Sequence, residues 1–218
     1  MQDTIAIIDY GSGNIHSAAK AFEKVTEDNN IPLRIVITDK PEVIKSSKAI
    51  VLPGQGAFGD CIDNLKNKSA IHDTLSESVL EQKKPFLGIC VGMQLLADKG
   101  YEHGEHDGLG WIGGEVVPLK PRDKTLKIPH MGWNNISSTQ TDMANMLLGS
   151  TLSQENFYFV HSFRYKIETQ ENIIATCDYG ETFPAIIGKD NIIGCQFHPE
   201  KSQKAGLKFI QNFLDNFL

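Results

Sequence analysis

The stretch Gly88-Ile-Cys90-Val-Gly92 places a cysteine between two glycines, each two residues away. It follows an apolar run and precedes a helical pattern, which predicts a strand, a sharp turn and a helix. Glycines at these positions make room for a strained turn that pushes the central side chain out of the sheet. The turn also places Cys90 at a helix N-terminus, where free N–H groups favour a thiolate. A lone cysteine is more often a small buried side chain, but the glycines and the polar Gln94 favour a nucleophile.

A cysteine nucleophile needs a base, and the base needs a group that orients it. The stretch His198-Pro-Glu200 supplies both residue types after a second apolar run. Pro199 biases His198 towards an extended conformation, and residues i and i+2 of an extended chain project to the same side. We therefore expect the Glu200 carboxylate beside the His198 imidazole, although this stretch alone would be interpreted as a surface turn.

A third stretch, Pro53-Gly54-Gln55-Gly56, follows another apolar strand. Acyl transfer develops negative charge on the substrate oxygen, and backbone N–H groups must face that charge. Glycines on both sides of Gln55 would allow its peptide plane to turn inward. The alternative is a plain turn at the end of a strand, which Pro-Gly marks by itself.

These stretches resemble the class I (triad) glutamine amidotransferases, whose signature is Gly-x-Cys-x-Gly-x-Gln followed later by His-Pro-Glu. The resemblance covers nearly the whole chain, from residues 9–14 to residues 198–202. Three further segments are similar to one branch of the family, the glutaminase subunits of imidazole glycerol phosphate synthases. They are Pro-Gly-x-Gly-Ala-Phe at 53–58, Pro-His-x-Gly-Trp-Asn at 129–134 and Phe-Val-His-Ser at 159–162.

The resemblance implies a role for each matching position. The catalytic triad would be Cys90, His198 and Glu200, and the backbone oxyanion donors would be the N–H groups of Gln55 and Val91. Substrate-binding positions would be Gly54, Gly56, Gln94, Glu102, Ser162 and Phe163. Partner-facing positions would be Asn14, Trp133 and Lys201. The chain departs from the family at Gln55, which is usually a small aliphatic residue, and at Phe163, which is usually Tyr.

The resemblance also implies an activity and a partner. Glutamine would be hydrolysed to glutamate and ammonia, without a cofactor or a metal. The ammonia would pass to a cyclase, a (β/α)8 barrel on a second polypeptide, and the heterodimer would make imidazole glycerol phosphate and aminoimidazole carboxamide ribonucleotide in histidine biosynthesis. One alternative is another triad glutaminase, such as the pyridoxal phosphate synthase subunit, whose Pro-Gly-Gly-Glu-Ser is absent here. Another is a non-enzymatic binding module, which loss of the triad would signal.

Length and composition limit the remaining possibilities. A chain of 218 residues suits one domain over 1–218, and 40% hydrophobic with 22% charged residues is ordinary for a soluble globular protein. The net charge of −6 argues against a general nucleic-acid binder. No apolar run approaches the ~20 residues that span a membrane. The start of the chain is unlike a signal peptide and the cysteines are scattered, so we expect a reducing, cytoplasmic setting.

The order of predicted elements indicates an α/β fold. Strands are predicted at 4–9, 33–38, 49–52, 86–90 and 192–195. Helices are predicted at 15–28, 41–47, 58–67, 70–82, from Cys90 to about 99, and 202–218. This alternation is typical of a mostly parallel open sheet flanked by helices. Short strands at 113–119, 157–161 and 173–177, without long helices between them, predict an antiparallel extension of that sheet.

Two other patterns suggest sites that the sequence does not complete. Gly11-x-Gly13 after the first strand is half of a dinucleotide-binding fingerprint, but His16 stands where the third glycine belongs. We interpret it as a tight turn. His103 and His106 lack a helical frame and a third ligand nearby, so we expect no zinc site there.

Overall fold

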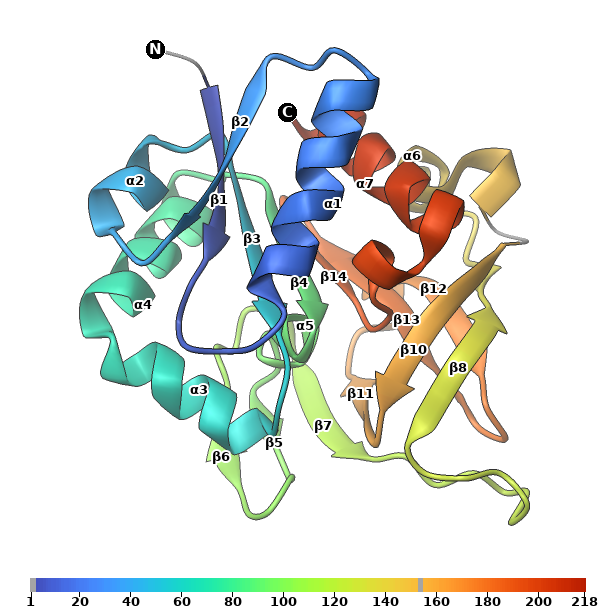
Figure 1. The fold of residues 1–218 in the computed structure, drawn as a ribbon. Helices are drawn as coiled ribbons and strands as arrows, with labels where there is room; N and C mark the ends of the chain where they lie inside the picture. The colour runs from blue at the N-terminus through green and yellow to red at the C-terminus, as the bar shows by residue number, and fades with distance from the viewer. Residues whose placement is uncertain (1–2, 153–154) are drawn as a thin grey trace.

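The computed structural model describes residues 3–152 and 155–218, and an eight-stranded sheet forms its centre (Figure 1). In spatial order the strands are β2 (Leu33–Thr38), β1 (Asp3–Ile8), β3 (Ala49–Gly54), β4 (Phe86–Cys90), β14 (Ile192–Cys195), β13 (Thr182–Lys189), β12 (Ile173–Asp178) and β9 (Ser137–Ser138). The pairs from β2 to β14 are parallel, and those from β14 to β9 are antiparallel. The predicted parallel sheet with an antiparallel extension is therefore confirmed.

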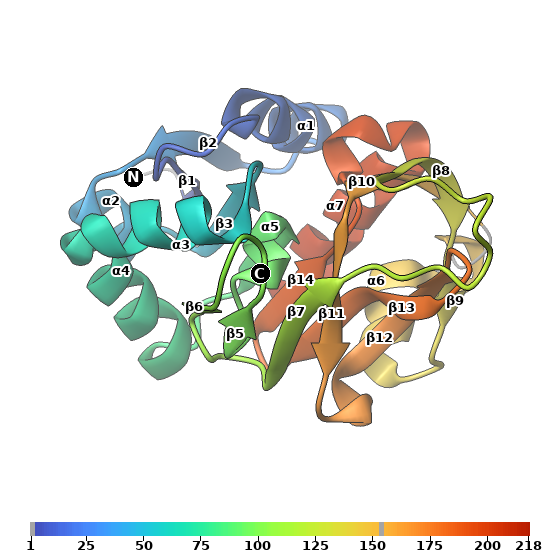
Figure 2. The ribbon, with the colours of Figure 1, turned by 90° about the horizontal axis from the view of Figure 1, so that it is seen from below.

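Two smaller sheets lie beside this one (Figure 2). One pairs β8 (His130–Asn135) with β10 (Asn156–His161), and the other contains β11 (Phe163–Ile167), β7 (Gly114–Pro118), β5 (Lys99–Gly100) and β6 (His106–Asp107). The expectation that 113–119 and 157–161 extend the main sheet is wrong, because β7 pairs with β11 and β5, and β10 pairs with β8. Only β12 joins the extension as expected. A short strand pattern does not encode which distant strand it will pair with.

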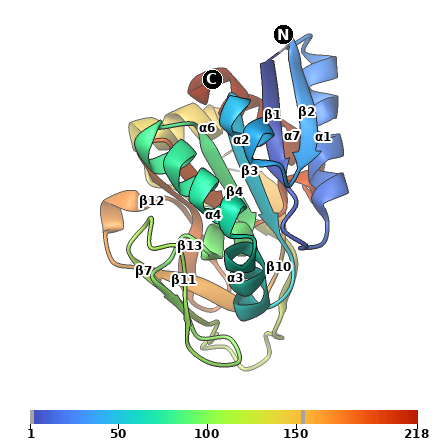
Figure 3. The ribbon, with the colours of Figure 1, turned by 90° about the vertical axis from the view of Figure 1, so that its left-hand side faces the viewer.

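Helices cover both faces of the main sheet. On one face α1 (Ile15–Asp28) contacts α7 (Gln203–Phe217), which in turn contacts α6 (Asp142–Leu152). On the other face α2 (Pro41–Ser46), α3 (Phe58–Asn67) and α4 (Ser69–Ser76) follow one another, and Figure 3 shows α2 and α4 across the strands from α1. The sequence did not predict α6, so the expectation of no long helix between the late strands is wrong there.

The apolar stripe of the last helix packs on the core as predicted. Ile210, Phe213 and Leu214 of α7 are buried, and Leu207 and Phe217 pack against the same cluster. The predicted helix at 70–82 is present as α4 followed by a π-helical turn, Glu77–Glu81. No helix within residues 3–152 and 155–218 is long and apolar enough to cross a bilayer.

The helix after Cys90 is much shorter than expected. It is α5 (Val91–Gln94), not a helix that runs to residue 99. The returning segment 109–111 ends it, because the carbonyl oxygens of Leu95, Leu96 and Ala97 accept hydrogen bonds from backbone N–H groups of that segment at 2.8–3.0 Å. Those carbonyls would otherwise continue the helical ladder, and the chain instead leaves through β5.

Candidate active site

The turn at Cys90 is a strained strand-to-helix elbow. Cys90 ends β4 and precedes α5, with φ 55° and ψ −110°, a backbone conformation that side chains rarely adopt. A Cβ on Gly92 would lie 1.8 Å from the carbonyl oxygen of Leu52, and one on Gly88 would lie 2.5 Å from the carbonyl oxygen of Gly92. Both glycines are therefore required by the close approach of β3, β4 and α5, and the predicted turn is present.

His198 and Glu200 lie together behind the elbow. His198 Nδ1 is 2.8 Å from Glu200 Oε1, and the two side chains are 3% and 1% exposed. His198 is extended, as predicted, but Pro199–Lys201 forms a 3-10 turn. The carboxylate therefore reaches the imidazole through this turn, and not through an extended chain. The Ser202 hydroxyl donates to the carbonyl of His198, and the backbone N–H of His198 donates to Tyr158 of β10.

The surroundings of His198 favour its protonated form. Burial alone would lower the pKa of His198. The charge of the Cys90 thiolate, a hydrogen bond to that sulfur, and the hydrogen bond and charge of Glu200 outweigh the burial and raise the pKa to about 10. The Asn14 side-chain amide also donates to Glu200 Oε1. His198 therefore lies between the Cys90 sulfur and the Glu200 carboxyl group, and both favour its imidazolium form.

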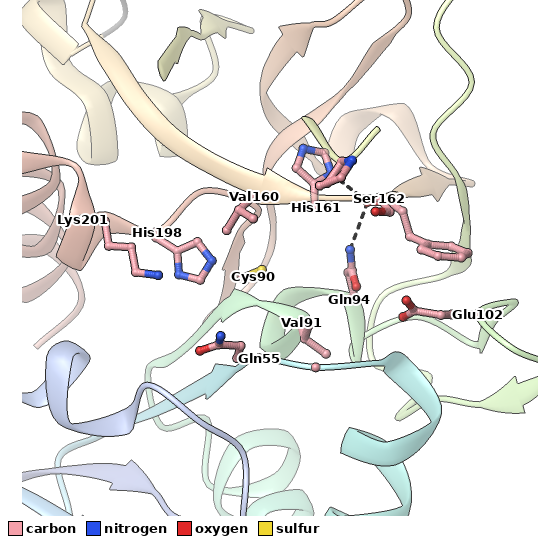
Figure 4. A pocket seen from close by; sticks show the side chains of 13 residues that line it. Gln55, Cys90, Val91, Gln94, Glu102, Val160, His161, Ser162, His198 and Lys201 are labelled. Atoms are coloured by element: carbon pink, nitrogen blue, oxygen red, sulfur yellow. Dashed lines mark hydrogen bonds between the residues drawn. The ribbon is translucent and has the colours of Figure 1, made fainter. Parts of the chain in front are cut away.

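A cavity of about 280 Å³ opens in front of Cys90 (Figure 4). His198 and Lys201 lie at one side of the sulfur, and Gln94, Glu102 and Ser162 lie at the other. A small substrate that spans the cavity therefore meets the nucleophile at one end and a set of polar groups at the other.

The polar end presents hydrogen-bond acceptors to the cavity. Gln94 Nε2 donates to the Phe163 carbonyl at 3.1 Å and to Gln196 Oε1 at 3.0 Å, which uses both of its protons. The Gln94 carbonyl oxygen is the remaining group of this side chain. Glu102 Oε2 accepts the backbone N–H of Phe58 at 2.8 Å, at the start of α3. An amide oxygen and a carboxylate suit a positively charged amino group.

The Gln55 backbone N–H is held away from Cys90 in this structure. It donates to the Ser12 hydroxyl at 2.7 Å, and that hydroxyl also lies 3.1 Å from the Gln55 carbonyl. This N–H is therefore not free to stabilise an oxyanion. Val91, by contrast, is the first residue of α5, where helix N–H groups have no partner within the helix.

Two of the three residues expected to face a partner lie beside one aromatic side chain. Trp133 is 48% exposed on β8, and its ring centroid is 5.9 Å from that of Tyr158. Lys201 Nζ lies 6.0 Å from the same Tyr158 ring. Trp133 and Lys201 thus flank one aromatic side chain, and Lys201 also lines the cavity. Asn14 is instead placed against the carboxylate of Glu200.

Comparison with known proteins agrees with this geometry. A sequence model of the glutamine amidotransferase class-I family matches residues 6–217. The chain belongs to the class I glutamine amidotransferase family. The Imidazole glycerol phosphate synthase subunit HisH of Rhodospirillum rubrum is 48% identical, over 96% of this chain and 97% of that protein. The same subunit of Rhodopseudomonas palustris is 46% identical, over 97% of this chain and 98% of that protein.

A crystal structure described as a glutamine amidotransferase has the same fold. It superposes with a TM-score of 0.70, at 17% identity, over 97% of both chains. At that identity the match supports the amidotransferase fold alone.

Sequence reasoning missed four residues around the amidotransferase site. Gln196 contacts Cys90, Ser12 contacts Gln55, and two buried histidines support the cavity wall. His161 Nδ1 lies 2.8 Å from the Phe163 carbonyl, and His130 Nδ1 lies 3.0 Å from His161 Nε2. Burial lowers the pKa of His161 to about 3 and that of His130 to about 4, so both stay neutral. In the sequence, His130 and His161 stand in matched motifs without an assigned role, and Gln196 is a polar residue between apolar Cys195 and Phe197.

The other cysteines differ from Cys90 in their environment. Burial raises the pKa of the Cys61 and Cys195 thiols, and that of Cys177 to about 12. They remain thiols near neutral pH and are poor nucleophiles. In the described part of the chain, no three His, Cys, Asp or Glu side chains gather as metal ligands would.

Proposed function

We propose that this chain is the glutaminase subunit of an imidazole glycerol phosphate synthase and hydrolyses L-glutamine to glutamate and ammonia. The observation that carries the proposal is the Cys90–His198–Glu200 arrangement at the base of a cavity with amino-group acceptors at its far end. It occurs in a chain 48% identical to a relative that bears this subunit's name.

The two halves of the reaction begin from protonated His198 beside Cys90. The Cys90 thiolate attacks the carboxamide carbon, and His198 gives its proton to the nitrogen as ammonia departs, which leaves a thioester. Neutral His198 then takes a proton from water while the water oxygen attacks the thioester carbon, and glutamate and the thiolate are released. Glu200, held by Asn14, keeps the imidazole oriented and stabilises its charged form.

The cavity orients glutamine by its amino-acid end. The α-amino group binds the Gln94 carbonyl oxygen and Glu102, and the α-carboxylate binds the backbone at Ser162 and Phe163. A backbone contact is consistent with Phe163 in place of the usual tyrosine, because no hydroxyl is needed. Gly54 and Gly56 leave room at the reacting end, where a Cβ on Gly54 would lie 2.7 Å from the Gly92 nitrogen.

The oxyanion of each tetrahedral intermediate forms beside Val91 and Gln55. Val91 offers its N–H at the start of α5. The Gln55 N–H becomes the second donor only after its peptide plane leaves Ser12 and turns towards Cys90. Gly56, at φ +119°, supplies a backbone that turns readily.

The partner is a cyclase subunit, a (β/α)8 barrel that uses the ammonia. Trp133 and Lys201 belong to the surface that meets it, because both are exposed around Tyr158 near the cavity mouth. Asn14 is linked to that surface through Glu200, because its side-chain amide donates to the Glu200 carboxylate. The complex is a cytoplasmic heterodimer that serves histidine biosynthesis.

Replacing the nucleophile tests this function. In a complex reconstituted with the cyclase, Cys90→Ala should abolish glutamine-dependent formation of imidazole glycerol phosphate, while ammonium salt should still support it. Cys177→Ala is the matched control and should keep both activities, because burial keeps that thiol protonated. Glutamine-dependent turnover by Cys90→Ala would refute the assignment. Failure of the native pair to use either nitrogen source would refute the proposed function.

A further inference from the structure

Gln196 is a buried polar residue that the mechanism above does not use. It follows β14, is 0% exposed, and its backbone N–H donates to the Ala185 carbonyl of β13 at 2.8 Å. Its side-chain nitrogen Nε2 lies 3.7 Å from Cys90 Sγ. Gln196 does not line the cavity, so it approaches the sulfur from inside the protein.

The direction of the Gln196 amide is fixed by its neighbours. The Phe163 carbonyl can only accept, so the Gln94 amide must point its nitrogen at that oxygen, 3.1 Å away. The second proton of the same nitrogen points at Gln196, 3.0 Å away, which must therefore present its oxygen. The Gln196 nitrogen is then left facing Cys90 Sγ as a donor. Neutral His161 also contacts the Phe163 carbonyl through its Nδ1. This contact helps to keep all the donors of the chain pointing in the same direction.

We propose that Gln196 is a positioning residue that donates an N–H to the Cys90 thiolate and holds the sulfur at the cavity floor. His198 also lies at the sulfur, so Gln196 is a second donor that fixes the direction of the thiolate as well as its charge. A hydrogen bond to a charged acceptor is stronger than a neutral one. This role rests on the proposed function only in taking Cys90 as the nucleophile.

The same chain of contacts links the nucleophile to the substrate end. Gln94 Nε2 donates one proton to Gln196 and the other to the Phe163 carbonyl, and the same side chain lines the cavity. Binding of the glutamine amino group to the Gln94 oxygen therefore acts on the residue that orients the Cys90 donor.

The test measures the thiolate without requiring turnover. Cys90 alkylation by iodoacetamide is followed against pH by peptide mass spectrometry, in the wild-type chain, Gln196→Met and Gln196→Glu. Met keeps the side-chain volume but has no donor. The pH midpoint, at which Cys90 alkylation reaches half of its maximal rate, should therefore rise by about one unit in Gln196→Met, with the rate at high pH unchanged. Glu adds a charge beside the sulfur and should raise the midpoint further.

Two results would overturn the proposal. A Gln196→Met midpoint equal to that of the wild-type chain would show that the side chain only fills space, as would a Glu midpoint no higher than that of Met. If the Met variant does not fold, Gln94→Leu serves instead: it leaves Gln196 in place without its orienting partner and should raise the midpoint by a smaller amount. An unchanged midpoint there would also refute the donor role. A chain that did not hydrolyse glutamine would refute the proposed function and leave this test valid.

Discussion

The charge of one histidine decides how the site begins its cycle. With its pKa raised to about 10, His198 carries a proton at neutral pH and faces the Cys90 sulfur. In the proposed mechanism, the proton for the departing ammonia is therefore already in place when glutamine arrives. Glu200 contributes by orientation and charge, since its Oε1 accepts hydrogen bonds from both His198 and Asn14.

Replacement of the two residues should have unequal effects. His198→Ala removes the group that moves the proton in both halves of the reaction, so kcat for glutamine hydrolysis should fall by several orders of magnitude. Glu200→Gln keeps a group that can accept from His198 and should cost less. Glutamate release under saturating glutamine measures both. If the Glu200 variant proved the slower enzyme, the assigned roles would be wrong.

The Gln55 N–H, which is the second oxyanion donor in the proposed mechanism, lies in the turn that follows β3. The hydroxyl of Ser12, in the turn before α1, accepts a hydrogen bond from the Gln55 N–H. Cys61 Sγ of α3 lies 3.7 Å from the Gln55 carbonyl oxygen. The peptide is thus held from behind by the β1–α1 turn and by α3. One hydroxyl accounts for the bond that must break before the N–H can face Cys90.

Removing that hydroxyl should release the peptide. Ser12→Ala leaves the Gln55 N–H without its acceptor, so the free energy of turning it towards Cys90 falls. The basal glutaminase rate of the isolated chain should rise, by at most the ~10²–10³ that one oxyanion donor contributes. Ser46→Ala, on the exposed end of α2, is the matched control and should not change the rate. A basal rate that Ser12→Ala leaves unchanged would show that this hydrogen bond does not restrain the peptide.

Short sequence patterns predicted most helices and strands and the triad residues. They could not predict contacts between segments that are distant in the sequence. The glycines around Cys90 predicted the sharp turn, and the spacing of His198 and Glu200 predicted the contact between their side chains. They could not indicate that segment 109–111 ends α5, or that Ser12 lies beneath Gln55. Gln196 was hidden for the same reason, because its partner Cys90 lies 106 positions away in the chain. Long-range packing, not local propensity, decides such contacts.

On the scale of the whole molecule, the buried histidines of the cavity wall make the free energy of unfolding depend on pH in acid. The pKa of His161 is lowered to about 3 by burial, against about 6.5 in an unfolded chain. Below pH 6.5 the unfolded chain binds a proton that the folded chain does not. The free energy of unfolding should therefore fall between about pH 6.5 and about 3, with His161 contributing up to ~1.4 kcal/mol per pH unit.

The variant His161→Asn separates this contribution from that of the carboxylates. Asn keeps a donor for the Phe163 carbonyl and does not titrate, so unfolding free energy should depend less steeply on pH between 6.5 and 3 than in the wild-type chain. Urea denaturation at several pH values measures both slopes. Equal slopes would mean that His161 takes up its proton in the folded chain as readily as in the unfolded one.

On the scale of the whole molecule, the proposed function requires that glutamine hydrolysis be coupled to the cyclase. A glutaminase that ran freely would waste glutamine and release ammonia into water, where it is protonated. The structure of the isolated chain has His198 and Glu200 in contact and the Gln55 N–H engaged by Ser12, so in the proposed mechanism it lacks one oxyanion donor. We expect this chain alone to bind glutamine and hydrolyse it slowly. The cyclase loaded with its nucleotide should turn the Gln55 peptide and raise glutamate release by at least ~10²–10³. Glutamate release is measured for the chain alone, with the cyclase, and with the cyclase and nucleotide. Equal rates in all three would rule out the switch and indicate a constitutive glutaminase.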